Sequence, residues 1–406
     1  MSAPNDAFAR GLDAAGPELD VIVLPRRAAV DAVNASWDAG RAVCVLDISS
    51  PAAVIAATID RLRPHALIDE SGRTLCTDPT PNDRDLCAII ATSGTGGEPK
   101  LVELSATARD AAAIRVNDAL GITSADRWLL TLPVGSVAAL AILARARLSY
   151  TPVEVHDHFD PMATIASKAS LVSLVPTQLQ RCAALGAGCF RGVLLGGAAA
   201  PKNLAPGWPI HRTYGSTETW GGIVHDGVPF PDVALRIGEH REIGELGEPR
   251  EIGEIELRTP SIFTRYRGDE PRTRAAFTND GWYRTGDAGS IDASGRLTVL
   301  GRLDDMIISG GHNISPLEVE NAIRAAFDVA DVAVIGCDDP HWGQHVHAIV
   351  VEQDRGPELT LDALRSELVI DGHKRPRQLT IVRELPRTSN GKVQKLQLRE
   401  QFGCGN

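Results

Sequence analysis

Short apolar runs alternate with stretches of helical character through the first two thirds of the chain. The apolar runs at residues 42–46, 86–91, 171–175 and 192–195 have the length of strands. Helical character is found between them, at residues 52–63, 106–120 and 177–185. Strands that alternate with helices predict a layered α/β fold.

The pattern changes from about residue 233. Residues 254–258 alternate polar and apolar side chains, which is the period of a half-exposed strand in a more antiparallel, β-rich region. We expect a domain boundary near residues 301–304, and therefore domains at 1–303 and 304–406. Beyond it, Pro316 begins a helical stretch at 316–327, and a small α+β unit is expected from strands at 332–336, 346–351 and 379–382 and a helix at 361–368.

Composition and charge narrow the class of protein. The 406 residues are 43% hydrophobic and 23% charged, as in soluble globular proteins, and a net charge of -11 gives no basic footprint for nucleic acid or anionic membrane. The seven cysteines are odd in number and scattered, so we expect neither a disulfide framework nor a zinc site. The first residues lack a signal-peptide pattern, and no apolar run is long enough to span a membrane, so a cytoplasmic location is expected.

The segment at residues 91–100 is the most informative. It follows an apolar run, and its glycines and hydroxyls can bring backbone N–H and O–H donors to phosphate oxygens, while Lys100 adds a positive charge. It does not fit the Walker A motif, because Pro99 stands where glycine is required and Leu101 where a hydroxyl is required. A surface glycine turn is the alternative. The predicted phosphate-binding residues are Thr92, Ser93, Gly94, Thr95, Gly96, Gly97 and Lys100.

Three further segments carry candidate chemistry. Residues 213–219 combine an aromatic ring, a glycine, hydroxyls and a carboxylate, which can stack on a base, contact a phosphate and hold Mg²⁺. Residues 283–287 and 301–305 offer a carboxylate and an arginine for ribose hydroxyls or phosphate. Lys392 lies on a glycine-bearing stretch and can reach a developing anion. The alternatives are, respectively, an ordinary turn, a surface salt bridge and a solvated lysine.

The order of these segments resembles the motif series of the acyl-adenylate-forming superfamily, which contains acyl-CoA synthetases, peptide-synthetase adenylation domains and luciferases. The six segments are TSGTGGEPK (92–100), LLGGAAAP (194–201), TYGSTE (213–218), YRTGD (283–287), GRLDDMIISGGHNISPLEVE (301–320) and PRTSNGKVQK (386–395). Within the superfamily, the chain is most similar to o-succinylbenzoate–CoA ligases. That similarity rests on its compact length and on WLLTLP (128–133), SLVPTQL (173–179) and GIVHDGVP (222–229).

The resemblance implies a large N-terminal domain of layered α/β subdomains plus a β-rich subdomain, followed by a small mobile α+β domain. It also implies an acid–CoA ligase that uses ATP, Mg²⁺ and coenzyme A and acts on a small carboxylic acid. The implied nucleotide-site roles are phosphate binding by Ser93 to Lys100; an adenine site of Gly196, Gly197, Ala198 and Tyr214, continued by Gly215 and Ser216; α-phosphate contact by Thr217; Mg²⁺ binding by Glu218; and ribose binding by Asp287 and Arg302. In the small domain, the resemblance implies a hinge at Asp304, a coenzyme A channel at Gly310 and Gly311 in a loop at residues 309–313, and adenylation by Lys392.

Three positions depart from the family pattern. Gly96 stands where a hydroxyl residue is usual, and Ile308 where lysine is common. Residues 134–136 (VGS) replace a segment that in o-succinylbenzoate ligases brings histidine to the acid pocket, so the acid is left open. An aryl or aliphatic pocket can be lined by Val134, Gly135, Trp220, Gly221 and Gly222, although Trp220 can equally belong to the core.

Two other functions stay open at this point. An enzyme that loads an acyl carrier protein would share every motif, and a non-catalytic nucleotide or acyl-adenylate binder is suggested by Gly96 and the missing histidine region. The presence of Lys392, Glu218 and Asp287 speaks against the second. A homodimer is also left open.

Overall fold

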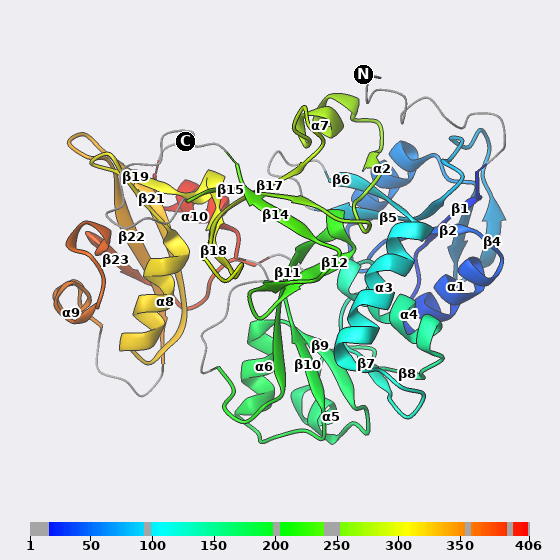
Figure 1. The fold of residues 1–406 in the computed structure, drawn as a ribbon, viewed down its shortest axis with the longest axis horizontal. Helices are drawn as coiled ribbons and strands as arrows, with labels where there is room; N and C mark the ends of the chain where they lie inside the picture. Colours follow the sequence, from blue (N-terminus) through cyan, green and yellow to red (C-terminus); the bar gives the residue numbers. More distant parts are fainter. Residues whose placement is uncertain are drawn as a thin grey trace.

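The structure is a computed structural model that describes residues 16–92, 99–197, 204–238, 252–353, 359–387 and 393–404. Its described strands form four sheets (Figure 1). None of the described helices has both the length and the apolar character needed to cross a bilayer.

The first sheet has seven strands and a mostly parallel centre. Its order is β16 (Arg265–Tyr266), β6 (Lys100–Ser105), β5 (Leu86–Thr92), β2 (Ala42–Val45), β1 (Leu19–Ile22), β3 (Ala66–Asp69) and β4 (Gly72–Leu75). β1, β2, β3 and β5 are parallel, whereas β5 and β6 form an antiparallel pair. The inner strands β1 and β2 are wholly buried, as in sheets that are covered on both faces. One face packs on α1 (Arg26–Asp38) and α3 (Ala106–Leu120), and the other on α2 (Ala52–Leu62).

The second sheet also has seven strands. Its order is β13 (Val228–Pro229), β12 (Gly221–His225), β11 (Ile210–Ser216), β10 (Gly192–Leu195), β9 (Leu171–Leu174), β7 (Trp128–Leu130) and β8 (Val153–Val155). The strands from β8 to β11 are parallel, and β12 and β13 complete the sheet antiparallel. α3 and α4 (Val137–Ser149) contribute to a core cluster that joins the two large sheets, while α5 (Pro161–Ala166) and α6 (Pro176–Ala183) lie towards the other side of the second sheet (Figure 1).

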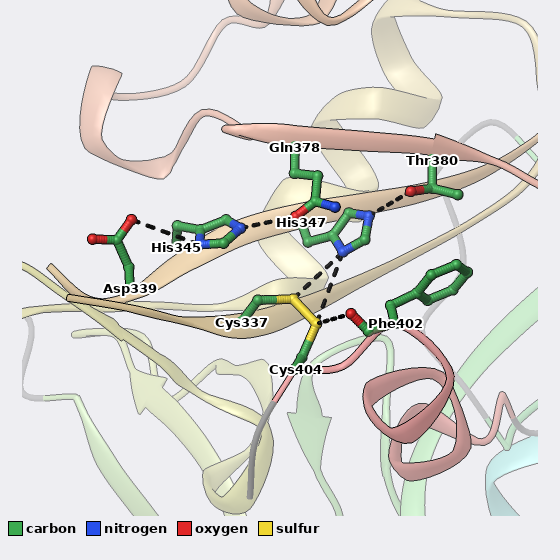
Figure 2. Close-up of a disulfide and its surroundings, with 8 residues drawn as sticks. All are labelled: Cys337, Asp339, His345, His347, Gln378, Thr380, Phe402 and Cys404. Carbon is green, nitrogen blue, oxygen red and sulfur yellow. Dashed lines mark hydrogen bonds and ion pairs between the residues drawn. A yellow bond between two sulfur atoms is a disulfide. The ribbon is translucent and has the colours of Figure 1, made fainter. Parts of the chain in front are cut away.

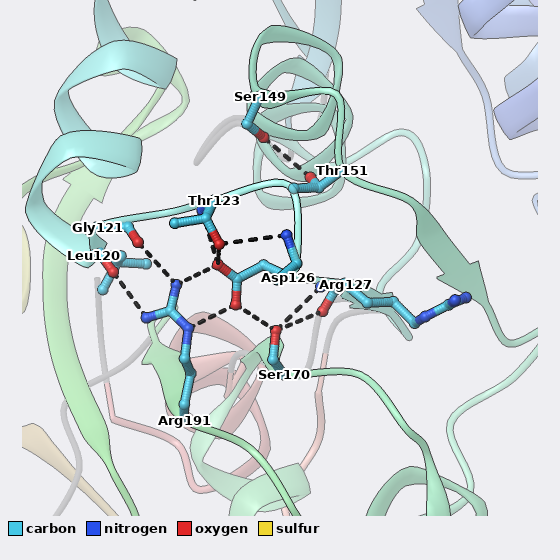
Figure 3. Close-up of polar contacts among 10 residues, drawn as sticks. Leu120, Gly121, Thr123, Asp126, Arg127, Ser149, Thr151, Ser170 and Arg191 are labelled. Atoms are coloured by element: carbon cyan, nitrogen blue, oxygen red, sulfur yellow. Dashed lines mark hydrogen bonds and ion pairs between the residues drawn. The ribbon is translucent and has the colours of Figure 1, made fainter.

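A buried carboxylate fastens the second sheet to the end of α3 (Figure 3). Asp126 accepts hydrogen bonds from Arg191 Nε at 2.6 Å and from Ser170 Oγ at 2.7 Å, and Arg191 also donates to the carbonyl of Leu120 at 2.8 Å. The hydrogen bonds from Arg191 hold the pKa of Asp126 well below its usual range. This network fixes the starts of β7, β9 and β10 relative to one another.

The third sheet is antiparallel, as the alternating pattern at 254–258 predicts. Its strands are β14 (Ala234–Ile237), β15 (Gly253–Arg258), β17 (Tyr283–Ile291) and β18 (Leu297–Arg302), and α7 (Glu270–Ala275) lies between β16 and β17 in the chain.

The elements after β18 gather at one end of the molecule (Figure 1). Their sheet consists of β20 (His312–Ile314), β19 (Ile307–Ser309), β22 (Gly343–Glu352), β21 (Val329–Asp339) and β23 (Gln378–Ile381). One face packs on α8 (Pro316–Ala326) and α9 (Leu361–Glu367), and the other on α10 (Lys395–Gln401). The predicted fold class is confirmed. The boundary at 303/304 stays a prediction, although no described core cluster includes residues from both sides of it.

Two expectations need correction. Residues 309–313, interpreted as a loop, belong to a hairpin in which β19 and β20 are joined by Gly310 and Gly311 at φ +59° and +80°, values that suit glycine. Cys337 and Cys404 are joined in a disulfide, although no disulfide framework was expected. Their 67-residue separation in sequence gave no sign of the pairing, because only the tertiary fold brings α10 back to β21.

Candidate nucleotide and acid site

A sharp chain reversal presents Thr217 and Glu218 at the end of β11. The strand continues through Ser216, so residues 213–216 are extended rather than part of a turn, and η2 (Thr217–Thr219) follows. Trp220 at φ +54° then returns the chain into β12, a backbone conformation that costs a residue with a side chain about 1–2 kcal/mol. A Cβ at Gly215 would lie 1.9 Å from the carbonyl oxygen of Gly221, so the close approach of the two strands requires glycine.

Glu218 is a buried carboxylate at the centre of this reversal. Of the described residues, only Tyr266 donates to it, from its hydroxyl to Oε1 at 2.9 Å. Burial, and then the charge of Glu218, raise the pKa of Tyr266, so this hydroxyl keeps its proton. Oε2 therefore retains lone pairs for a hard cation, and this donor set fits Mg²⁺. Tyr266 lies on β16, 48 residues from Glu218, and no sequence motif indicated it.

Lys100 lies beside this carboxylate. Its Nζ is 5.5 Å from the ring centroid of Tyr266, which in turn contacts Glu218. Burial lowers the pKa of the Lys100 ammonium, and the charge of Glu218 opposes that effect. Lys100 is opposite Thr92 in the β5–β6 pair, so the two described ends of the predicted phosphate-binding segment adjoin. Ser93, Gly94, Thr95, Gly96 and Gly97 lie outside the described residues.

The predicted ribose-binding residues meet across two sheets. Asp287 on β17 is opposite Arg302 on β18, with Arg302 Nη1 at 3.2 Å from Asp287 Oδ1. Tyr214, which comes from β11, donates its hydroxyl to Asp287 Oδ2 at 2.8 Å. Burial, and then the Asp287 charge, raise the pKa of Tyr214, so it remains a donor. Three residues that were predicted from separate motifs therefore form one hydrogen-bonded group.

The remaining predicted residues are distributed around this group. Gly196 and Gly197 directly follow β10, and Asp304 lies in η3 (Leu303–Asp305). A Cβ at Gly310 would meet the ring of Trp342 at 2.8 Å, which explains why the tip of this hairpin lacks a side chain. Ala198 and Lys392 lie outside the described residues.

Two residues of the predicted acid-pocket lining belong to the hydrophobic core. Val134 and Trp220 are both buried in the main hydrophobic cluster, at 5% and 1% exposure. The alternative interpretation of Trp220 as a core residue is therefore the better one. Gly221 and Gly222 lie half-buried in β12.

Sequence reasoning missed a buried arginine on α4. Arg145 has no ion-pair partner in the described part of the chain, and its guanidinium lies over the ring of Trp128 at 5.6 Å from the centroid. Burial lowers its pKa to about 10. Because it lies within an apolar, helical stretch of sequence, only its position in the fold marks it out.

Several polar atoms near Arg145 are also unsatisfied. Asn117 Nδ2 donates to the carbonyl of Arg145 at 3.1 Å, but neither Asn117 Oδ1 nor Trp128 Nε1 has a hydrogen-bond partner among the described residues. The same is true of Nε2 of His225, which is opposite Thr213 in the sheet. Burial, and then the charge of Arg145, lower the pKa of His225 to about 3. A group of buried donors and acceptors without partners indicates a place for a polar ligand or water.

Comparison with known proteins identifies the family. The model of the AMP-binding enzyme family matches residues 4–267, and that of the AMP-binding enzyme C-terminal domain matches residues 318–392. The chain belongs to the AMP-binding enzymes. The resemblance to acyl-adenylate-forming enzymes is thereby confirmed, and the matched regions include every predicted site residue before Tyr283 together with Lys392.

Relatives of this AMP-binding enzyme include ligases for two different acids. The chain is 36% identical over 330 residues to the 2-succinylbenzoate–CoA ligase of Listeria monocytogenes serotype 4b, covering 77% of this chain and 70% of that one. It is 35% identical over 371 residues to the indoleacetate–CoA ligase of Aromatoleum aromaticum, covering 82% and 71%. The structure of o-succinylbenzoate CoA synthetase from Bacillus subtilis with its acyl-adenylate intermediate matches with a TM-score of 0.82 and 27% identity, over 95% of this chain and 88% of that one.

Proposed function

We propose that this AMP-binding enzyme converts a carboxylic acid that bears a second carboxylate into its coenzyme A thioester, and that 2-succinylbenzoate is the acid. The activity class is that of its named relatives, which are CoA ligases. The choice of acid rests on one observation: the buried guanidinium of Arg145 lacks an anionic partner among the described residues.

The first step joins two anions. An oxygen of the substrate carboxylate attacks the α-phosphorus of ATP, the bond to the β-phosphate oxygen breaks, and pyrophosphate leaves. Because negative charge must be neutralised as the anions approach, we expect the main catalytic contribution to be electrostatic. Glu218 would hold Mg²⁺, which neutralises phosphate charge when bound, and Lys100 and Lys392 would add positive charge at the leaving and attacking groups.

The nucleotide would be held by the hydrogen-bonded group of Tyr214, Asp287 and Arg302. A carboxylate can accept from both vicinal ribose hydroxyls, and Asp287 already has its orientation fixed by Tyr214 and Arg302. Binding therefore requires little rearrangement of these side chains, which lowers its cost in entropy.

The acid would be held beside β12. This strand starts directly after the Thr217–Glu218 reversal, and its far end carries His225, four residues of extended chain or about 13 Å away. An acid that is activated near Thr217 would lie along this strand, with its second carboxylate directed towards the end where the charge of Arg145 acts on His225. Indoleacetate has a single carboxylate, which is consumed in the adenylate, so it would leave Arg145 buried without a partner, and this favours the diacid.

A substrate comparison tests the proposal. Pyrophosphate release would be measured with 2-succinylbenzoate, with 4-oxo-4-phenylbutanoate, which lacks the ring carboxylate, and with indoleacetate. We expect kcat/KM to favour 2-succinylbenzoate about 10- to 100-fold, the value of one charge-assisted hydrogen-bonded pair. In Arg145→Met this preference should collapse, whereas Arg147→Met, on the exposed side of the same helix, should keep it. A preference that survives in Arg145→Met would remove Arg145 from the acid site.

Lys392 is tested by separating the two half-reactions. We expect Lys392→Ala to slow adenylation about 10²- to 10³-fold, as for the loss of one preorganised electrostatic contact, and to spare transfer to coenzyme A from a supplied acyl-adenylate. Equal losses in both half-reactions would contradict the role. Transfer to an acyl carrier protein, a homodimer, a cytoplasmic location and the hinge at Asp304 stay predictions.

A further inference from the structure

A buried cysteine pair joins β21 of the C-terminal sheet to the residues after α10 (Figure 2). Cys337 is on β21, a strand at the edge of the sheet that pairs with β22, and Cys404 follows α10; they form a disulfide and are only 5% and 6% exposed. The other five cysteines are free. None of the functions proposed above uses this pair.

A histidine faces both sulfurs. His347 on β22 is fully buried, and its Nδ1 lies 3.4 Å from Cys337 Sγ and 4.0 Å from Cys404 Sγ. Its Nε2 lies 2.8 Å from the hydroxyl of Thr380 on β23, which can accept the Nε2 proton and so leave the lone pair of Nδ1 directed at the sulfurs. Burial, and then the charge of His345, lower the pKa of His347 to about 4, so the ring is neutral near pH 7.

This arrangement suits the reduced pair as well as the disulfide. A disulfide has no S–H group to donate to Nδ1, so that lone pair lacks a donor among the described residues, although buried polar atoms are normally satisfied. A thiol on Cys337 would supply the missing S–H donor. The site can therefore accommodate both the disulfide and the two thiols while His347 keeps its hydrogen bond to Thr380.

The disulfide fixes one end of α10, and the other end adjoins the segment that carries Lys392. Arg387 and Val393 form an isolated β-bridge, and the N–H of Gln394 donates to the carbonyl of Pro386 at 2.9 Å, so the described residues that flank 388–392 are held together. α10 begins two residues after this bridge and leads to Cys404. Whatever fixes α10 on the sheet therefore also fixes the base of this segment.

We propose that Cys337 and Cys404 are a reversible thiol–disulfide pair that regulates adenylation, because their oxidation fixes α10 to β21 and so restrains the base of the segment bearing Lys392. The effect on adenylation rests on the function proposed for Lys392 above, whereas the reversible pairing does not.

The exchange balances with a low-molecular-weight disulfide, RSSR, as the oxidant. The thiolate of Cys404 attacks RSSR, forms a mixed disulfide and releases the first RS⁻. The Cys337 thiol, hydrogen-bonded to Nδ1 of His347, then loses its proton, and its thiolate attacks Sγ of Cys404 and releases the second RS⁻. The two thiol protons end on the two released thiolates, so two electrons pass from the protein to RSSR. The first step requires local opening of the residues after α10, because Cys404 is only 6% exposed.

A metal site is the competing use of the same side chains. One ligand atom from each of Cys337, His347 and Cys404 lies within 4.8 Å of the others. Structural zinc sites take four protein ligands, and the described residues supply three in this group. The disulfide itself also occupies the two thiolates that a thiophilic cation would need, so the structure favours the redox pair.

The first measurement counts thiols in the full-length native chain. The chain would be equilibrated in buffers of different glutathione to glutathione disulfide ratio, quenched in acid, denatured and alkylated for mass spectrometry. We expect a reversible change between seven and five reactive thiols, confined to peptides that contain Cys337 and Cys404. Cys189→Ser, an exposed free cysteine, is the matched control and should change from six to four; Cys337→Ser and Cys404→Ser should both stay at six.

The second measurement asks what the disulfide restrains. We expect the oxidised chain to form the acyl-adenylate about three- to tenfold faster than the reduced chain, because a fixed α10 preorganises the lysine-bearing segment. Transfer from a supplied adenylate to coenzyme A should agree within about twofold, since that half-reaction does not use Lys392. The difference should disappear in Cys404→Ser and persist in Cys189→Ser. Trypsin cleavage after Lys392, which needs no acid, should be slower in the oxidised chain.

Each result decides the proposal. Five thiols at every glutathione ratio, retention of one zinc per reduced chain with resistance to oxidation, or equal trypsin cleavage in the two states would overturn it. If no acid supports adenylation, the proposed function fails, and the thiol count and the cleavage rate still decide the redox pair.

Discussion

Two buried arginines on neighbouring helices have opposite surroundings. Arg115 on α3 donates to Asp232 at 2.5–3.1 Å, to Ser261 at 3.0 Å and to Thr259 at 2.8 Å. Arg145 on α4 has the ring of Trp128 and no carboxylate in the described residues. Burial of a guanidinium is costly unless its charge is paired, so the first site is complete within the protein and the second is not.

The difference separates structural charges from functional ones. Arg115 links α3 to the strand end and loop that carry Thr259 and Ser261, and its removal would leave Asp232 without a side-chain donor among the described residues. Arg145 holds nothing comparable in place through its side chain. A charge that the fold buries without a partner is best explained by an anion that arrives from outside.

The largest expected effect tests this contrast by stability. Arg115→Met should lower the free energy of unfolding by about 2–4 kcal/mol, since it removes the hydrogen bonds of a buried guanidinium to Asp232, Ser261 and Thr259. Arg145→Met should leave that free energy unchanged or raise it, because it removes an unpaired buried charge. Urea unfolding of both variants measures the difference. Equal destabilisation would mean that Arg145 has a structural partner, and the contrast between a paired Arg115 and an unpaired Arg145 would then be wrong.

The same contrast extends to two buried carboxylates. Glu103 accepts hydrogen bonds from Arg265 at 2.8 Å and Arg267 at 2.6 Å, whereas Glu218 accepts from Tyr266 alone in the part of the chain that the structure describes. We expect Glu218→Gln to lower kcat about 10²-fold and to weaken Mg-ATP use, with an unchanged unfolding midpoint. Glu103→Gln should lower the unfolding midpoint and leave kcat and Mg-ATP use unchanged. Steady-state pyrophosphate release across a magnesium titration measures the first effect, and unchanged kinetics in Glu218→Gln would remove that carboxylate from the site.

The smallest expected effect concerns pH. The folded state holds the pKa of His225 at about 3, below the ordinary value, so the unfolded chain binds a proton between pH 6.5 and 3 that the native state does not. This contribution to stability is complete above pH 6.5 and is lost on acidification, by about 1 kcal/mol at pH 5.5. His225→Gln should flatten the fall in stability over this range, while His158→Gln, at an exposed position, should not. A bound diacid that pairs with Arg145 should reduce the effect in the wild type.

The sequence was sufficient for most of the architecture. Local apolar patterning predicts the strands at 86–92 and 192–195 and the helix at 106–120. This pattern can be seen in the sequence because it does not depend on which other segments pack against each element. Tyr214, Glu218, Asp287 and Arg302 could be selected because each lies in a motif whose residues are adjacent in sequence.

Only the tertiary structure decided the partners of these residues. The hydroxyl of Tyr266 reaches Glu218 from another sheet, the charge of Arg145 on α4 lowers the pKa of His225 on β12, and Cys404 returns to Cys337 from the end of α10. Pairing between residues far apart in the chain depends on how the layers pack, and packing leaves no periodic signal in sequence. The sequence by itself determined that this protein adenylates an acid. The fold decided which buried charges are paired within the protein and which lack a partner among the described residues, because burial and distance exist only in three dimensions.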